Sequence, residues 1–428
     1  MTRVGLAFHR TFHSLHTRNF RLFFMGQAVS VTGTWLNATA SAWLVVRLSH
    51  ASGIALGVNV ALTFLPILLV GAFGGMLADR LDKRKILMST QAVYAVLAFT
   101  LFALAATGVA RLWMVYGLSF AAGLVTALDN PTRQSFYMEL VPEADLTNAV
   151  SLNSAVFMGS RILGASIAGA VIATIGIAAC FLIDGISYIA VIGALLAMRT
   201  ADLHGRGRAS RERGGVREGF RYVWNSPELR RPLVLMTVVF TLGFNWAVLL
   251  PLLAKRTFDG SSATFAAMSA LTGVGAFVAA LIMANRASSP ASAPSMRRLA
   301  SFSIASGVAL LLTAIAPTLE LSYATMVLLG LSVMVFIITA NSMLQLRSKP
   351  EFRGRVMALY GMVFLGSTPV GAVLTGLLAE HLGARAGFLM GAVAALAAGS
   401  GGLWWHARTA MPAAVPIDAV IADQQLTA

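Results

Sequence analysis

The sequence predicts an all-α integral membrane protein with twelve transmembrane helices, arranged as two six-helix bundles. Its mean hydropathy is +0.76, and only 11% of its residues are charged, whereas about 25% are charged in soluble proteins. The charges lie in short patches between long apolar runs, and the second half of the chain repeats motifs of the first half. This distribution excludes a soluble domain, and we expect no nucleic-acid partner despite the net charge of +15.

Each of the apolar runs is long enough to cross a bilayer, which takes about 20 residues in a helix. We expect spans at 21–46, 54–76, 86–107, 112–134, 149–173, 177–198, 232–254, 263–285, 298–316, 320–343, 356–379 and 386–406. The first run is longer than the roughly 7–15-residue apolar core of a signal peptide. We therefore expect it to remain in the protein as the first span.

The basic residues give these spans an orientation. Most of the 32 Lys and Arg residues lie in the segments on one side of the spans. The opposite side holds only Arg47, Arg111, Lys255, Arg256 and Arg385. Because positive charges collect on the cytoplasmic side of membrane proteins, we expect both termini in the cytoplasm and a multi-pass protein of the cell (inner) membrane.

The longest polar segment divides the spans six and six. We expect a cytoplasmic N-terminal tail at 1–20, an N-terminal bundle at 21–198, a cytoplasmic central loop at 199–231, a C-terminal bundle at 232–406 and a cytoplasmic C-terminal tail at 407–428. Residues 218–229 of the central loop carry apolar side chains on one helical face, which predicts an amphipathic surface helix. No loop is long enough for a nucleotide-binding domain, so an ATP-driven pump is not expected.

The two halves share short motifs in the same order. The matching pairs are Val70-Gly71-Ala72-Phe73 and Val274-Gly275-Ala276-Phe277, Asn130 with Gln134 and Asn341 with Gln345, and Pro142-Glu143 and Pro350-Glu351. A parallel six-plus-six repeat of this kind is typical of transporters whose binding site lies between the two halves.

Several motifs resemble those of major facilitator superfamily transporters. Gly75-Met76-Leu77-Ala78-Asp79-Arg80 resembles the signature between spans two and three of that superfamily. Motifs similar to those of its drug- and siderophore-exporting branch, which includes macrolide-efflux and enterobactin-exporter proteins, are Asn19-Phe20-Arg21-Leu22, Asn130-Pro131-Thr132-Arg133-Gln134 and Gly354-Arg355-Val356. The resemblance implies a secondary active exporter of small amphipathic molecules, drug- or siderophore-like, that works by alternating access with proton antiport.

Two other functions remain to be weighed against export. An importer or facilitator of a small metabolite is the alternative, because the fold does not fix the direction of transport. A membrane enzyme is not expected, because no His, Ser or Cys constellation lies at the membrane surface. The single Cys180 and the spacing of the histidines predict no metal site and no cofactor. We expect a monomer whose partners are a small-molecule substrate, protons and the lipid bilayer.

The basic turn between spans two and three has a functional and a structural interpretation. The resemblance implies a conformational latch, with the residues Gly75, Asp79, Arg80, Arg84 and Arg355. Asp79 would cap the positive N-terminus of the span-eleven helix, which we expect to begin near Val356, when the cytoplasmic side is shut. The alternative is that the basic residues only anchor the topology. The second-half copy, Asn285-Arg286, has lost the acid, so the latch would be one-sided.

Two charged residues lie near the middle of predicted spans, Arg161 in span five and Asp184 in span six. Charges inside a membrane cost several kcal/mol and usually face the bundle interior. The depths of these two differ by about 7 Å at 1.5 Å per helical residue. They are the coupling candidates, and a static ion pair or no contact at all are the alternatives. Span four has no basic residue between Arg111 and Arg133, where many drug–proton antiporters carry a buried arginine.

Polar and aromatic residues at mid-span depth are candidates for the substrate path. These are Gln27, Thr34, Trp35, Asn37, Asn59, Asn245 and Trp246. A largely apolar cavity with few polar groups suits bulky amphipathic ligands. Each of these residues could equally form a helix–helix hydrogen bond, typically worth about 0.6 kcal/mol in a membrane.

Overall fold

The computed structural model describes residues 13–203, 216–286 and 294–409, and within these ranges the regular structure is helical. The first half contains η1 (His13–His16), α2 (Arg18–Leu48), α3 (Gly53–Arg80), α4 (Lys83–Ala106), α5 (Leu112–Leu140), η2 (Glu143–Asp145), α6 (Leu146–Thr174), α7 (Ile177–Leu196) and η3 (Thr200–Asp202). The second half contains α8 (Val216–Asn225), α9 (Pro227–Gly243), α10 (Trp246–Leu252), η4 (Leu253–Thr257), α11 (Ser262–Arg286), α12 (Met296–Ile315), α13 (Leu319–Arg347), α14 (Pro350–Gly366), α15 (Thr368–Leu382) and α16 (Ala384–Thr409).

Length and hydropathy suit most of these helices to a membrane. Across the described part of the chain, 11 helical segments are long and apolar enough to cross one. The helix α2 is as long as the others but falls outside this set. Its apolar character is diluted by polar residues such as Gln27, Thr34 and Asn37, because much of this helix faces the protein interior rather than lipid.

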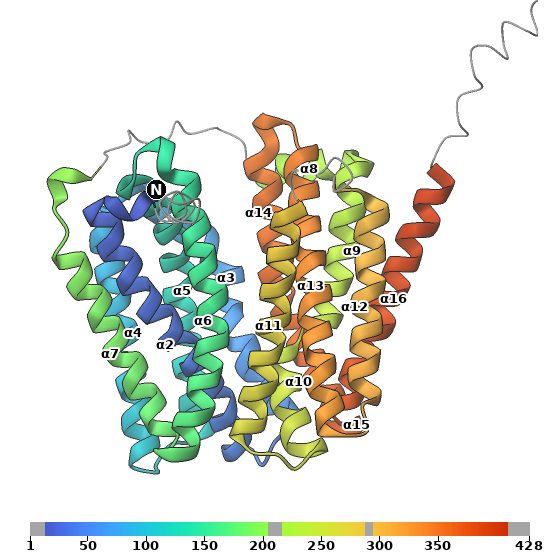
Figure 1. Cartoon of the computed structure of the whole chain (residues 1–428), viewed down its shortest axis with the longest axis horizontal. Helices are drawn as coiled ribbons and strands as arrows, with labels where there is room; N and C mark the ends of the chain where they lie inside the picture. Colours follow the sequence, from blue (N-terminus) through green and yellow to red (C-terminus); the bar gives the residue numbers. More distant parts are fainter. Residues whose placement is uncertain (1–12, 204–215, 287–293, 410–428) are drawn as a thin grey trace, which may run out of the picture.

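The helices form two bundles side by side, α2–α7 and α9–α16, with α8 lying across one end of the second bundle (Figure 1). The bundles meet through α3 against α15 and α6 against α11. At the first contact a Cβ on Gly57 would lie 2.6 Å from the carbonyl oxygen of Ala372, and one on Gly376 would lie 2.5 Å from that of Gly53. Glycine is therefore required at both positions for the helices to approach so closely.

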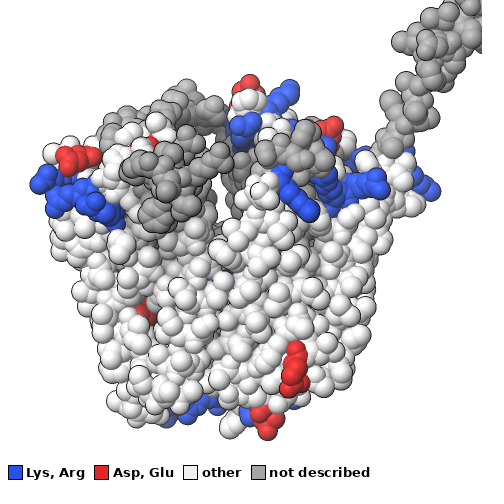
Figure 2. Space-filling view, in the orientation of Figure 1, with Lys and Arg blue, Asp and Glu red and all other residues white. Residues whose placement is uncertain are grey.

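The two ends of the molecule differ. Lys and Arg gather at the end of the molecule where α8 lies, here called the basic end (Figure 2). At the opposite end, here called the closed end, the bundles touch, whereas at the basic end they stand apart (Figure 1). The glycines agree with this, because a Cβ added to Gly75 or Gly354, both toward the basic end, would have no neighbouring atom within 4 Å.

Two spans that the sequence predicts as continuous are interrupted. The segment predicted at 232–254 breaks at Phe244–Asn245, between α9 and α10. The segment predicted at 356–379 begins earlier, at Pro350, and breaks at Ser367, between α14 and α15. Proline is well suited to the first turn of a helix because it lacks the backbone N–H that would be unpaired there. Pro350 and Pro369 stand in the first turns of α14 and α15.

Candidate functional site

The middle of α2 carries the largest group of predicted path residues. Thr34 is exposed and its Oγ1 lies 3.3 Å from Oη of Tyr188 on α7. Asn37 donates a 2.7 Å hydrogen bond from Nδ2 to Oδ2 of Asp184, also on α7. These two residues thus lie on the side of α2 that faces α7 and the interior of the molecule.

Asp184 is fully buried inside the first bundle. Its Oδ2 is bonded to Asn37, while its Oδ1 has no hydrogen-bond partner in the described structure. The described residues also give it no ion pair, and in particular none with Arg161. Residues two apart on a helix point about 200° apart. Asn37 therefore contacts Asp184 on one side of α2, while Trp35 contacts Arg161 on the opposite side. Among the described residues, the static ion pair weighed as an alternative for Arg161 and Asp184 is therefore not formed.

Arg161 rests on an aromatic surface instead of an acid. Its guanidinium carbon lies 5.4 Å from the centre of the Trp35 ring, at a distance typical of a cation–π contact. The ring of Phe157 meets Trp35 edge-on, with 5.7 Å between ring centres. The side chain of Arg161 is half-buried, and among the described residues it forms no ion pair.

A buried ionic network near the basic end was not foreseen from the sequence. The helix α5 continues past the predicted end of span four to Leu140, so Arg133 lies within the helix and its side chain is half-buried. Arg133 forms an ion pair with Asp129, four residues earlier, and donates a 2.5 Å hydrogen bond to Oε1 of Gln27. Asp129 itself is buried, and the ion pair compensates its charge. The i, i+4 spacing of opposite charges was the available signal.

Asp129 accepts further hydrogen bonds from Thr90 Oγ1 at 2.7 Å and Gln91 Nε2 at 3.1 Å on α4. Together these residues tie α2, α4 and α5 to one another. Gln27 belongs to this network, so its amide oxygen is not free for a ligand. Asn59 is likewise engaged, since its Oδ1 accepts a 2.9 Å bond from Ser119 of α5. Both side chains thus form the helix–helix hydrogen bonds that were the alternative to a place in the substrate path.

The predicted latch residues that the structure describes have partners elsewhere or are exposed. The side chain of Asp79 lies outside the described residues. Arg80 is exposed, and Gly75 is half-buried with open space beside it. Arg84 donates from Nε to the carbonyl of Leu195 at 2.8 Å, at the C-terminus of α7, where a cation is favoured by the helix dipole.

Arg355 belongs to the second half alone. It pairs with Glu218 of α8 at 3.4 Å and its guanidinium lies 5.0 Å from the ring of Phe352. The helix that Asp79 would cap starts at Pro350 rather than near Val356. In the described part of the chain, the bonds of Arg84 and Arg355 stay within their own halves, and the latch stays a prediction.

At the closed end a hydrogen bond from the backbone of α3 to a carboxylate of α15 joins the two halves. Glu380, at the end of α15, accepts a 2.5 Å hydrogen bond at Oε2 from the backbone N–H of Gly53, the first residue of α3. Arg256 of η4 donates to the same oxygen at 3.1 Å and to the carbonyl oxygens of Ala379 and Glu380. Nearby, the rings of Trp43 and Phe265 stack across the halves at 6.2 Å. These contacts shut this end.

The second half contributes an aromatic cluster at the break in its first span. Asn245 donates to the carbonyl of Thr241 at 2.8 Å, while its Oδ1 is buried without a partner in the described structure. Trp246 lies 5.3 Å from Phe244 between ring centres. Other rings of the cluster belong to Phe240, Phe336, Phe364 and Tyr360. Broken helices at mid-membrane depth commonly form the binding sites of transporters.

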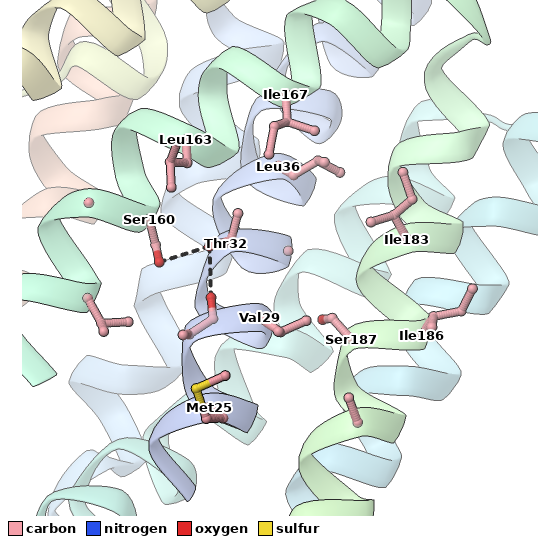
Figure 3. Close-up of a pocket in the computed structure, with 15 residues that line it drawn as sticks. Met25, Val29, Thr32, Leu36, Ser160, Leu163, Ile167, Ile183, Ile186 and Ser187 are labelled. Carbon is pink, nitrogen blue, oxygen red and sulfur yellow. Dashed lines mark hydrogen bonds between the residues drawn. The ribbon is translucent and has the colours of Figure 1, made fainter. Parts of the chain in front are cut away.

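A separate cavity of about 640 Å³ lies on the side of the first bundle, between α2, α6 and α7 (Figure 3). Its walls are formed mainly by apolar side chains such as Met25, Leu163 and Ile186. Thr32 and Ser160 bond to each other at 2.9 Å there, and Ser187 bonds to the backbone of α7. With its hydroxyls engaged, this cavity offers little polar recognition, and we place the candidate site between the bundles instead.

The surface at the basic end brings together His13, His16 and Asp145, with ligand atoms within 4.8 Å of one another. His13 Nδ1 lies 3.0 Å from Asp145 Oδ1, and both histidines are exposed. This contact fastens η1 to the start of α6. The site is therefore understood as a surface hydrogen bond that holds the beginning of the described chain.

Comparison with known proteins gives a consistent family. A model described as transmembrane secretion effector matches residues 9–419. The staphyloferrin A transporter of Staphylococcus aureus is 25% identical over 85% of this chain and 90% of its own length. Macrolide efflux protein A of Streptococcus pyogenes is 23% identical over 87% and 92%, and the multidrug efflux pump Tap of Mycolicibacterium fortuitum is 27% identical over 83% and 88%.

Solved structures confirm the fold. A bacterial homologue of the human lysosomal transporter Spinster, in an inward-facing and occupied conformation, gives a TM-score of 0.72 at 14% identity, over 91% of this chain and 96% of that one. A POT family transporter gives 0.74 at 11% identity, over 91% and 96%. The family and the named relatives are membrane transporters rather than enzymes. The chain therefore belongs to the transmembrane secretion effector family of the major facilitator superfamily and is a multi-pass transporter of the cell membrane.

Proposed function

We propose that this protein is a secondary active exporter of small amphipathic molecules that works by alternating access. The observation that carries the proposal is the difference between the two ends, since the closed end is shut by Glu380 and Arg256 while the bundles part at the basic end. Thr34, near the middle of α2, is exposed in this arrangement. A mid-membrane site reachable from one side only is what alternating access requires.

The orientation follows from the distribution of charge. Lys and Arg gather at the basic end (Figure 2), and positive residues favour the cytoplasmic side. On this basis both termini lie in the cytoplasm and the conformation is inward-facing. The helix α2 is then also a span, and with the 11 others it brings the total to twelve. The relatives named for macrolide and multidrug efflux support export over the import of a metabolite.

Proton antiport needs a group inside the membrane that can gain and lose a proton. Asp129 is neutralised by Arg133 and bonded to Thr90 and Gln91. Asp184 has no cation, and its Oδ1 has no hydrogen-bond partner in the described structure. A buried carboxylate without a neighbouring cation is unfavourable as an ion, so Asp184 is the proton acceptor that we propose, with Asn37 positioning it.

Inside-out membrane vesicles test this proposal. With an acidic lumen, wild-type protein is expected to concentrate the dye dansyl-phenylalanine, and collapse of the gradient with nigericin should abolish the uptake. Asp184→Asn should remove the dependence on the gradient, whereas Asp259→Asn, which changes an exposed loop aspartate, should leave it intact. Loss of dye from the lumen under the same gradient would support import, and full gradient-driven uptake by Asp184→Asn would exclude this residue as the coupling group.

A further inference from the structure

The direction in which Arg161 points is fixed by the neighbours of α6. Gly164 lies against the backbone of α2 near Thr32, and Ile162 lies against Gly273 of α11. Leu163 is 57% exposed on the outer side of the bundle. Successive residues turn by about 100°, which places Arg161 between the face on α2 and the face on α11, opposite Leu163. Arg161 therefore points toward the space between the two halves.

This charge lacks a partner of opposite sign. In the described residues its contact is the ring of Trp35, and a cation–π contact restores only part of the hydration that a buried ion loses. Arg133, another half-buried arginine of the first bundle, is neutralised by Asp129. Asp184 lies on the far side of α2, bonded to Asn37. An uncompensated cation at mid-membrane depth makes this space favourable for an anion.

The surroundings of Arg161 are aromatic rather than polar. Trp35 and Phe157 form an edge-on pair beside it. On the facing half, Phe244 and Trp246 stand at the break between α9 and α10, and α10 packs against α2 and α3. A ligand held here would combine one anionic group with an apolar or aromatic body.

We propose that Arg161, supported by Trp35 and Phe157, is an anion-binding subsite, and that the transported molecules are amphipathic carboxylates. The guanidinium holds the carboxylate through charge-assisted hydrogen bonds, and the aromatic residues of both halves contact the body of the ligand. This inference rests on the proposed function, because it assigns a substrate class to the same central site.

A matched pair of probes tests the subsite by binding alone. Dansyl-phenylalanine carries a carboxylate, and dansyl-phenylalaninamide is its neutral counterpart with the same aromatic body. Purified protein in lipid nanodiscs is expected to bind the carboxylate at least about tenfold more tightly than the amide, as a charge-assisted hydrogen bond would give. Dansyl fluorescence measures both affinities.

Variants of Arg161 distinguish the loss of its charge from a loss of folding. Arg161→Gln should weaken carboxylate binding about tenfold or more and leave amide binding unchanged, which also shows that the variant is folded. Arg161→Lys should recover part of the carboxylate affinity, and Arg111→Gln, an exposed arginine, should behave as wild type. Trp35→Phe should weaken both probes to a similar degree.

Two results would overturn the subsite. One is a wild-type protein without preference for the carboxylate, including one that binds neither probe. The other is an Arg161→Gln variant that weakens both probes equally. Because binding is measured without a gradient, carboxylate preference together with no uptake in vesicles would leave the subsite standing and contradict the exporter proposal instead.

Discussion

At the scale of single residues, hydrogen bonding decides which polar side chains are free for a ligand. Among the predicted path residues, Gln27 is held by Arg133 and Asn59 by Ser119, whereas Thr34 is exposed. A buried polar group in a membrane needs a partner inside the protein, because lipid offers none. The residues that remain incompletely bonded or uncompensated are those on which our proposals rest, Asp184 and Arg161.

The Asp129–Arg133 pair leads to a prediction about stability. Arg133→Gln leaves the carboxylate of Asp129, which is 1% exposed, without its cation and should destabilise the protein by about 3–5 kcal/mol. Thermal unfolding of the purified protein measures the loss. Asp129→Asn combined with Arg133→Gln should lose less than the sum of the two single changes, and Lys85→Gln, at an exposed position, should have little effect. Additive losses would show that the ion pair contributes nothing as a pair.

At the scale of helices, close approach and interruption shape the region between the halves. The α3–α15 contact depends on glycines that bring the backbones together, and the breaks at Phe244–Asn245 and Ser367 lie near the middle of their spans. Hydropathy predicts how long an apolar run is, and so the spans were located well. It carries no information on where the backbone bends inside a run, which is why both breaks were missed.

The glycine contact gives a prediction about conformation. Gly57→Val would place side-chain atoms against the Ala372 carbonyl, since even a Cβ would lie 2.6 Å from it, and should force the closed end apart. Accessibility of cysteines placed at the closed end to a membrane-impermeant maleimide should rise. Gly193→Val, where an added Cβ meets no atom within 4 Å, is the matched control in α7. Unchanged accessibility in Gly57→Val would mean that this contact does not hold the end shut.

At the scale of the whole molecule, the contact that closes one end has a predicted counterpart at the opposite end, the latch of Asp79. The contact between Glu380, Arg256 and the N-terminus of α3 is formed here, while the contacts predicted for Asp79 at the other end require the bundles to meet there. Both would place a carboxylate at the start of a helix in the opposite half, where the helix dipole favours negative charge. Alternating access then amounts to exchanging one set for the other.

A variant of Glu380 at the closed end tests this exchange directly. Glu380→Gln removes the charge that Arg256 and the Gly53 N–H share and should cost the closed end about 1 kcal/mol, a roughly fivefold shift of the population toward opening. Distances between spin labels at His50→Cys and Leu382→Cys, in a Cys180→Ala background, would report it. Glu320→Gln, an exposed glutamate in the first turn of α13, is the control. An unchanged distance distribution in Glu380→Gln would remove this contact from the mechanism.

The sequence by itself determined the helical membrane fold, the positions of the spans, the side on which basic residues gather and the transporter family. These properties follow from the partitioning of each residue between water and hydrocarbon, which sums along the chain and needs no knowledge of neighbours. The tertiary structure alone decided that Arg161 meets Trp35 rather than Asp184, that Arg133 pairs with the buried Asp129, and that Glu380 bonds the start of α3 at one end. Such pairings depend on the rotation and depth of each helix, which packing between distant segments fixes.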